Sequence, residues 1–174
     1  MLEVEVKILE IRREEVEQRL LSLGAVKTFD GEMYALFYDR PDGSLSARGD
    51  VLRLRREGDS TALVYKSPVS REGAKIMQEY ETTVGSLEVV HQILEQLDIR
   101  PIKKTRKFRT QYDLSGVHIA IDDYQDEMEA IPVFMEIEAP ELQSLTQTAA
   151  LLGFGPDQFL TWSTYELAQH YLKG

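Results

Sequence analysis

The sequence predicts an α+β fold, in which helices cover the outside of an antiparallel β-sheet or β-barrel. Two observations lead to this prediction. Segments along the whole chain alternate apolar and charged residues with the period of two that is typical of strands, and most of them are separated by short turns. Four further segments carry apolar residues at helical spacing. With 174 residues, the chain is long enough to bury a substantial core, so we expect one domain over residues 1–174.

Eight segments have the strand pattern. They cover residues 2–8, 33–39, 51–57, 62–67, 77–84, 101–113, 116–122 and 132–138. Between the second and third, Pro41-Asp42-Gly43 predicts a turn, because proline fixes φ and glycine permits positive φ. Leu114-Ser115-Gly116 predicts a tight hairpin connection. Strands joined by hairpins run antiparallel. The mixture of Ser, Pro, Gly and charged residues over 67–75 predicts a mobile loop.

Four helices are predicted. The first covers 10–23 and ends before Gly24, and the second covers 86–97 with Ser86 as its N-cap. The third covers 140–152 and the fourth 156–172. Both begin with a proline, whose missing N–H is tolerated in the first helical turn.

Composition excludes several classes of function. The sequence has no cysteine, which excludes disulfides, thiolate catalysis and cysteine-bound zinc. A net charge of −10 argues against a general nucleic-acid binder, which needs a basic face. No apolar run approaches the roughly 20 residues of a membrane span, and the N-terminal residues lack a signal-peptide pattern. We therefore expect a cytoplasmic protein with neither nucleic-acid nor membrane partners.

The first predicted strand shows the charge pattern that several other strands repeat. Glu3, Glu5 and Lys7 share one face, while the opposite face is apolar. One interpretation is an open sheet with helices on its apolar side and water on the other. The alternative is a closed barrel with a charged interior, which would remove all sheet edges. Charges in a narrow interior must bind one another, a metal or a polyanionic ligand.

In the barrel interpretation, cations and carboxylates both point inward. The cations are Lys7, Arg53, Arg55, Lys66, Lys104 and Arg106, and the acids are Glu3, Glu5, Glu79, Glu81, Asp122, Glu136 and Glu138. Arginine and lysine bind phosphoryl oxygens, and paired carboxylates hold Mg²⁺ or Mn²⁺. The combination predicts a site for a metal-bridged polyphosphate, where catalysis is mainly positioning and charge stabilisation.

These residues resemble the CYTH superfamily of triphosphate tunnel enzymes, which includes class IV adenylyl cyclases and triphosphatases. The resemblance runs over nearly the whole chain. Its motifs are Glu3-Val4-Glu5-Val6-Lys7, Tyr38-Asp39-Arg40-Pro41-Asp42-Gly43, Leu52-Arg53-Leu54-Arg55, Tyr65-Lys66, Glu79-Tyr80-Glu81, Lys104-Thr105-Arg106, Ile121-Asp122 and Glu136-Ile137-Glu138.

The resemblance implies an eight-stranded antiparallel tunnel, a bound triphosphate and a possible homodimer. The triphosphate ligands would be Lys7, Arg53, Arg55, Lys66, Lys104 and Arg106. Mg²⁺ or Mn²⁺ would be held by Glu3, Glu5, Glu136 and Glu138, with Asp122 and Glu81 close by.

The predicted function is most like that of a class IV adenylyl cyclase, which converts ATP to cyclic AMP and pyrophosphate. The alternative is a triphosphatase acting on inorganic triphosphate, thiamine triphosphate or a nucleoside triphosphate. Lys7 and Lys66 are the candidate catalytic residues, since a lysine with a lowered pKa can act as a general base.

Two interpretations from other classes are a non-catalytic polyphosphate- or nucleotide-binding module and a carrier barrel with an apolar interior. The full set of carboxylates argues against the binding module, and the charged strand faces argue against the carrier. Three further side chains have ambiguous roles: His118, on a charged face, and Arg71 and Lys75, either solvated or part of a lid.

Overall fold

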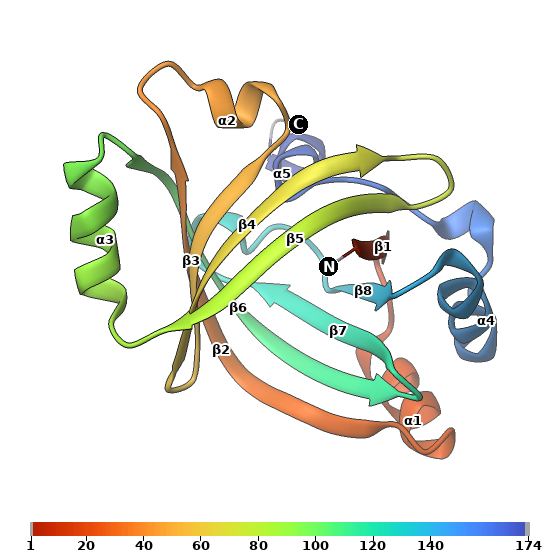
Figure 1. Cartoon of the computed structure of the whole chain (residues 1–174). Coiled ribbons are helices and arrows are strands. Elements are labelled where there is room, and N and C mark those ends of the chain that lie inside the picture. The colour runs from red at the N-terminus through yellow and green to blue at the C-terminus, as the bar shows by residue number, and fades with distance from the viewer. Residues whose placement is uncertain (1, 173–174) are drawn as a thin grey trace.

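The chain forms a closed antiparallel barrel of eight strands, seen in a computed structural model that describes residues 2–172 (Figure 1). Around the barrel the strands follow the order β1-β5-β4-β3-β2-β6-β7-β8. Their bounds are β1 Leu2–Ile8, β2 Val26–Asp39, β3 Val51–Glu57, β4 Ser60–Ser70, β5 Lys75–Val84, β6 Arg100–Leu114, β7 Val117–Tyr124 and β8 Phe134–Ala139. This confirms the predicted fold class and decides between the open sheet and the closed barrel.

Helices lie outside the barrel (Figure 1). Their bounds are α1 Arg13–Ser22, α2 Ser44–Ala47, α3 Leu87–Gln96, α4 Leu142–Leu152 and α5 Thr164–Leu172, with short 3-10 turns η1 Asp126–Met128 and η2 Pro156–Gln158. None of the helices within residues 2–172 combines the length and the apolar character that a membrane crossing requires.

The outer faces of β1, β7 and β8 form the main core together with α1 and α4. Val6, Ile119 and Ile137 are fully buried there, as are Leu20 of α1 and Leu145 of α4. These are the apolar positions that alternate with charged residues along the strands. Burying them outside the barrel turns their charged neighbours toward its interior.

A smaller core joins α3 to the outer face of β2 and β3. Leu54 of β3 is fully buried beside Leu94 of α3 and Tyr38 of β2. Ser86 caps the helix, because its Oγ accepts a hydrogen bond from the N–H of Val89 at 3.2 Å. The cap predicted from sequence is therefore present. Because Leu52 and Leu54 point outward to α3, Arg53 and Arg55 point inward.

The hairpin between β4 and β5 corrects the predicted loop over 67–75. Pairing continues through Pro68 opposite Met77 and Ser70 opposite Ile76, and a register shift between residues 68 and 70 accommodates the proline. Only the tip, residues 71–74, lies outside the strands. The composition of this segment indicated a loop, but pairing with the neighbouring strand keeps it extended.

The predicted helix over 156–172 is interrupted. A 3-10 turn is followed by an extended stretch, and α5 begins at Thr164. The interruption occurs because Leu160 pairs with Lys7 of β1, whose N–H donates to the Leu160 carbonyl at 2.8 Å. In the reverse direction, the Leu160 N–H donates to the Lys7 carbonyl at 3.0 Å. This long-range pairing overrides the local helical pattern.

Turn chemistry elsewhere agrees with the sequence. The β6–β7 connection is the predicted two-residue turn, with φ of 55° at Ser115 and 83° at Gly116. Two positive φ values suit the right-handed twist of a hairpin. β2, by contrast, begins at Val26, earlier than the predicted residue 33, because its polar first half pairs with β6.

Truncating Leu54 to alanine should destabilise the protein by about 2–5 kcal/mol, because the change leaves a cavity beneath α3. The matched control is Val89→Ala on the exposed side of α3, where 54% of Val89 is accessible. The control should change stability by less than about 0.5 kcal/mol. Urea unfolding monitored by circular dichroism measures both. Equal effects would contradict the placement of α3.

Candidate functional site

The barrel encloses a cavity of about 1470 Å³ that side chains from all eight strands line. Charged side chains of both signs line much of its wall. The strand cations that line it are Lys7, Arg53, Arg55, Lys66, Lys75, Lys103, Lys107 and Arg109, and the strand acids are Glu3, Glu5, Glu57, Glu79, Glu81, Glu136 and Glu138. This is the charged interior that the closed-barrel interpretation requires.

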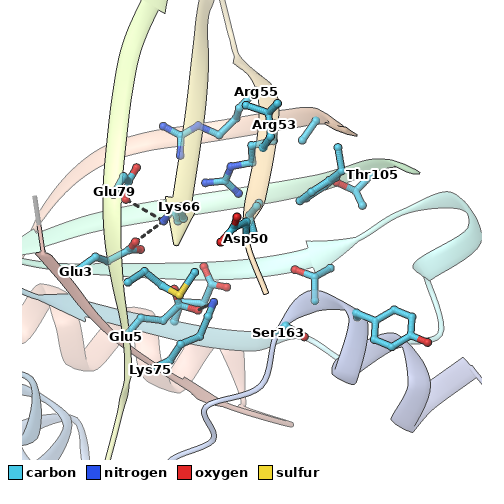
Figure 2. Close-up of a pocket in the computed structure, with 18 of the residues that line it drawn as sticks. Glu3, Glu5, Asp50, Arg53, Arg55, Lys66, Lys75, Glu79, Thr105 and Ser163 are labelled. Atoms are coloured by element: carbon cyan, nitrogen blue, oxygen red, sulfur yellow. Dashed lines mark hydrogen bonds and ion pairs between the residues drawn. The ribbon is translucent and has the colours of Figure 1, made fainter. Parts of the chain in front are cut away.

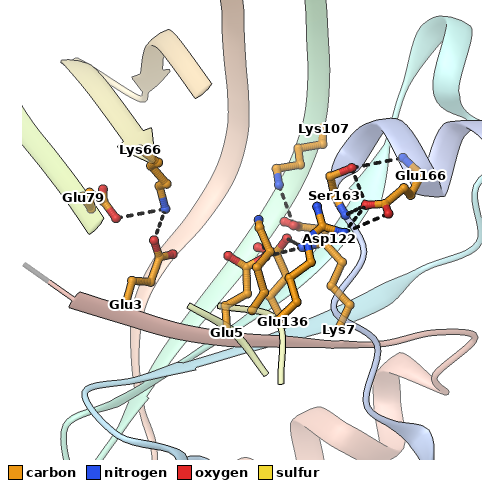
Figure 3. A network of polar contacts seen from close by, with 12 residues as sticks. Glu3, Glu5, Lys7, Lys66, Glu79, Lys107, Asp122, Glu136, Ser163 and Glu166 are labelled. Carbon is orange, nitrogen blue, oxygen red and sulfur yellow. Dashed lines mark hydrogen bonds and ion pairs between the residues drawn. The ribbon is translucent and has the colours of Figure 1, made fainter. Parts of the chain in front are cut away.

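One cluster centres on the ammonium group of Lys66, which lies between two carboxyl groups (Figure 3). It contacts Glu3 of β1 and lies 2.9 Å from Glu79 of β5. Burial raises the pKa of Glu3 to about 9, with Glu138 and Glu5 adding to the shift and Lys66 opposing it. The pKa of Glu79 is lowered to about 2, because hydrogen bonding with Glu3 and the charge of Lys66 outweigh burial. Glu3 is thus the protonated member of a carboxyl–carboxylate pair.

A second cluster surrounds Lys7. Its ammonium contacts Glu5 on the same strand and lies 3.0 Å from Glu136 on β8. Burial alone would lower the pKa of Lys7, but Glu136 and Glu5 outweigh it and raise that pKa. The pKa of Glu5 falls to about 2 despite burial, because Lys7 and Lys75 are close, the latter at 3.3 Å. Lys7 is therefore held as an ammonium ion.

A third cluster lies on β6, β7 and β8. Asp122 is fully buried, and its oxygens accept hydrogen bonds from Lys107 at 2.5 Å and from Arg109 at 2.6 and 2.7 Å. Arg109 also bonds Glu136 at 2.5 Å. Burial, together with nearby Arg109, lowers the pKa of Lys107 to about 8, against the opposing charge of Asp122. Asp122, predicted to lie near a metal, is thus occupied by two cations.

The predicted inward face of β6 is wrong. Lys104 and Arg106 lie on the outer face and are exposed, while Lys107 and Arg109 line the cavity. Arg106 forms a surface ion pair with Asp126 at 2.6 Å. The error has a physical reason: basic residues occur on both faces of this strand, so the alternation of charge did not identify the inner one.

Two inward cations have no counter-ion. Within residues 2–172, neither Arg53 nor Lys103 forms an ion pair or hydrogen bond, and Nε of Arg53 is buried without a partner. The next inward residue of the same strand, Arg55 (labelled with Arg53 in Figure 2), differs. It binds Glu81 at 3.0 Å and lies 3.4 Å from Glu57. Burial lowers the pKa of both unpaired groups. A partly buried cation without a partner destabilises the protein unless a ligand supplies the missing negative charge.

The acids predicted to bind metal lie in the same wall, on adjacent strands. Glu5 is directly opposite Glu138, and Lys7 is directly opposite Glu136. As the side chains stand, no three acidic or histidine residues in the described part of the chain are grouped to hold a metal ion. Their oxygen chemistry nevertheless suits Mg²⁺ or Mn²⁺. Burial is the largest cause of the raised pKa of Glu3, and the nearby charges of Glu138 and Glu5 raise it further, so these acids lie close enough to repel one another.

Glu81 lies further along the wall, bound to Arg55. Lys75 was predicted in the loop 67–75, but it begins β5 and lines the cavity beside Glu5. Arg71 lies at the hairpin tip and binds Glu166 of α5 at 2.9 Å. His118 lines the cavity, with Nδ1 3.5 Å from Asp113.

Sequence reasoning missed Lys103, Lys107 and Arg109 as cavity residues. On other strands, a row of apolar residues marks the outer face and so identifies the inner one. On β6 this row is weak, because the outward residues include Lys104 and Arg106. A signal was available at Asp122, which lies directly opposite Arg109 in the β6–β7 ladder. Counting back from the turn at Ser115-Gly116 gives this register.

Comparison with known proteins identifies the same family that the motifs suggested. The model of the CYTH domain family matches residues 1–166. No curated protein matches the sequence.

Solved structures share the fold at low identity. A candidate adenylate cyclase from Vibrio parahaemolyticus superimposes with a TM-score of 0.84 at 18% identity, over 97% of this chain and 98% of that one. The PH1819 protein of Pyrococcus horikoshii gives 0.78 at 23%, over 97% and 98%. A candidate adenylyl cyclase from Hippeastrum, described as having a dominant triphosphatase activity, gives 0.70 at 17%, over 97% and 95%.

A pH series of unfolding measurements can test the register of β6. Lys107 loses its proton near pH 8 when folded but near 10.5 otherwise, so between these values the unfolded chain binds more protons. The contribution of Lys107 to the free energy of unfolding therefore rises with pH across that window, with the slope expected when the unfolded state binds about one proton more. The free energy of unfolding of wild type minus that of Lys107→Met should therefore increase with pH across this window.

The matched control is Lys104→Met, which removes a lysine from the exposed outer face of the same strand. Urea unfolding at intervals from pH 7 to 10.5 measures both. A pH-dependent difference from wild type for Lys104→Met, with none for Lys107→Met, would mean that the two faces of β6 are exchanged.

Proposed function

Because the chain belongs to the CYTH domain family, we propose that its tunnel binds a compound with a linear triphosphate and catalyses attack on one of the phosphorus atoms. The observation that carries this proposal is Arg53, which faces the tunnel without an ion pair and whose Nε is buried without a hydrogen-bond partner. A phosphate would supply both the negative charge and the acceptor oxygens that this group lacks.

We propose a corrected set of triphosphate ligands. Lys7, Arg53, Arg55 and Lys66 keep the role predicted from sequence, and Lys107 and Arg109 replace Lys104 and Arg106. Most of these cations are paired with carboxylates in the free protein, so a triphosphate would compete for them. Arginine can bind two phosphoryl oxygens at once, which favours a fixed orientation of the chain of phosphates.

Divalent metal binding is proposed for Glu3, Glu5, Glu136 and Glu138. Bound there, Mg²⁺ or Mn²⁺ would supply charge neutralisation of the phosphate oxygens. Glu3 would have to give up its proton, and Glu5 and Glu136 would have to release Lys7. A cation and a triphosphate therefore favour each other's binding, since the released ammonium becomes free to bind phosphate.

The first proposed reaction is that of an adenylyl cyclase. The ribose 3′-oxygen of ATP would attack the α-phosphorus, forming the cyclic ester and breaking the bond to the β-phosphate, which leaves as pyrophosphate. The hydroxyl proton must pass to a base. Lys7 and Lys66 stay proposed for catalysis, but Glu5 and Glu136 hold Lys7 protonated in the free protein. Lys107, whose pKa is lowered to about 8, is a further candidate base.

The second candidate is a triphosphatase, in which water attacks the terminal phosphorus and orthophosphate leaves. The structurally similar Hippeastrum protein supports this second candidate, because it is described as a candidate adenylyl cyclase with a dominant triphosphatase activity. The same cations would serve both reactions, and the difference lies in which phosphorus faces the nucleophile. A cytoplasmic location and a homodimer stay predictions.

Product analysis separates the candidates. The protein would be incubated with ATP, inorganic triphosphate or thiamine triphosphate, each with Mg²⁺ or Mn²⁺, and the products resolved by chromatography. Cyclic AMP and pyrophosphate from ATP are the expected result. Orthophosphate without a cyclic nucleotide would overturn the cyclase in favour of the triphosphatase, whereas tight binding without turnover would mean a binding module.

Arg53→Gln should weaken binding of inorganic triphosphate by roughly 10- to 150-fold, since charge-assisted hydrogen bonds contribute about 1.5–3 kcal/mol. Stability of the free protein should stay equal or rise, because the variant removes a buried, unpaired cation. Calorimetric titration and urea unfolding measure the two effects. Arg106→Gln, on the outer face, is the control and should leave binding within about twofold. Unchanged affinity in Arg53→Gln would refute the assigned binding site.

A further inference from the structure

Resting on this proposed function, we propose that the triphosphate enters and leaves the tunnel through only one of its two mouths, the mouth beside α2. The inference goes beyond binding, because it predicts a route for substrate and product through the barrel. Its basis is the unequal distribution of unpaired charge between the two ends of the cavity.

The cavity reaches solvent at both ends of the barrel. At one end, which we call the α2 mouth, the lining residues Ala47, Arg48 and Tyr165 are exposed. At the other end, which we call the acidic mouth, the exposed lining residues include Thr83 of β5 and His118 of β7. Figure 1 shows α2 and α5 toward the upper end of the barrel and the β3–β4 and β6–β7 turns at its lower end.

The strand register assigns charged residues to these two mouths. β2 ends at the α2 mouth, where β3 and β6 begin, and there Arg53 and Lys103 flank the same position of β2. β3 ends with Glu57 at the β3–β4 turn. On β8, Glu138 is directly opposite His118, which follows the β6–β7 turn. Glu57 and Glu138 therefore lie at the acidic mouth.

Positive charge is in excess at the α2 mouth. Lys103 has no ion-pair partner among the described residues, nor has Arg53 just inside the mouth. The other charges that line this end neutralise one another in two ion pairs. These are Arg48 with Asp50 at 2.6 Å and Arg71 of the β4–β5 hairpin with Glu166 of α5 at 2.9 Å.

Negative charge is in excess at the acidic mouth. Arg55 lies 3.4 Å from Glu57 and 3.0 Å from Glu81, so that one cation is shared by two carboxylates. Within residues 2–172, Glu138 forms no ion pair. The tunnel is therefore polarised along its length, with unpaired cations at one end and uncompensated carboxylates at the other.

A triphosphate carries several negative charges, so the two mouths affect it in opposite ways. A charged cleft raises the association rate of an oppositely charged ligand by about 10- to 1000-fold. Lys103 and Arg53 would attract the triphosphate at the α2 mouth. At the acidic mouth, Glu57 and Glu138 would repel it. Pyrophosphate and orthophosphate, the proposed products, are anions too, and would leave by the route through which the triphosphate enters.

The sequence has no cysteine, so each mouth can be blocked through a single introduced thiol. Ala47→Cys places the thiol at the α2 mouth, and Thr83→Cys, which hardly changes side-chain volume, places it at the acidic mouth. Each variant would be coupled to a maleimide that carries a bulky polymer, and then titrated calorimetrically with inorganic triphosphate without divalent metal. Coupled Ala47→Cys should take up no measurable triphosphate. Coupled Thr83→Cys and both uncoupled variants should bind it like wild type.

Loading the protein before coupling distinguishes a blocked route from a damaged site. Variants loaded with inorganic triphosphate would be coupled and desalted, and the triphosphate that stays bound would be measured as phosphate after acid hydrolysis. Coupled Ala47→Cys should retain its triphosphate, because the exit is closed as well. Coupled Thr83→Cys should lose it as fast as the uncoupled protein does.

Several results would overturn the inference. Loss of uptake in coupled Thr83→Cys alone would reverse the assignment of the two mouths, and uptake by both coupled variants, or by neither, would remove the distinction between them. Immediate release from preloaded, coupled Ala47→Cys would mean that the polymer disturbs the site and not the route. Failure of unmodified wild type to bind inorganic triphosphate would instead reject the proposed triphosphate site itself.

Discussion

Charge pairing inside the barrel is the constraint on which the rest of the structure depends. Closing the sheet brings the charged faces of eight strands into one cavity, where an isolated charge would be strongly destabilising. Lys66 is therefore held between Glu3 and Glu79, Lys7 between Glu5 and Glu136, and Asp122 is shared by two cations. Most of these ion pairs join side chains of different strands, so they also help to fix the register in which the strands pair.

This pairing explains why the few departures from it are informative. Arg53 on β3 and Lys103 on β6 flank the same position of β2, and among the described residues neither has a counter-ion. The free protein therefore carries an excess of positive charge there. At the acidic wall the imbalance has the opposite sign, and protonation of Glu3 relieves it. A ligand that combines an anion with a cation would correct both imbalances at once, which is the composition of a metal-bound polyphosphate.

The sequence predicted those parts of the fold in which apolar and charged residues alternate strictly. The outward face of β1 is apolar throughout, and that of β3 carries Leu52 and Leu54. Glu3, Glu5, Lys7, Arg53 and Arg55 all point inward as expected. On β6 basic residues occupy both faces, and the predicted inner face was wrong. The site therefore contains Lys107 and Arg109, which only the pairing with β7 identifies.

Other differences arose where tertiary pairing outweighed local preference. The segment 67–75 has loop composition, and the segment after 156 has a helical pattern, yet both follow the strands beside them. Single-sequence patterns do not contain these long-range contacts. Turn and cap signals, such as Ser86 and Ser115-Gly116, depend on adjacent residues and were therefore predictable.

The seam between β1 and β8 has a consequence for how the chain is made. Val4 pairs with Ala139, so during synthesis the sheet stays open until β8 has left the ribosome, on the order of ten seconds after β1 at typical rates. Contacts between such distant residues also slow folding. Throughout this interval the future interior is exposed to water, and its charges keep that face soluble. The same residues proposed to bind substrate would thus protect the nascent sheet from aggregation.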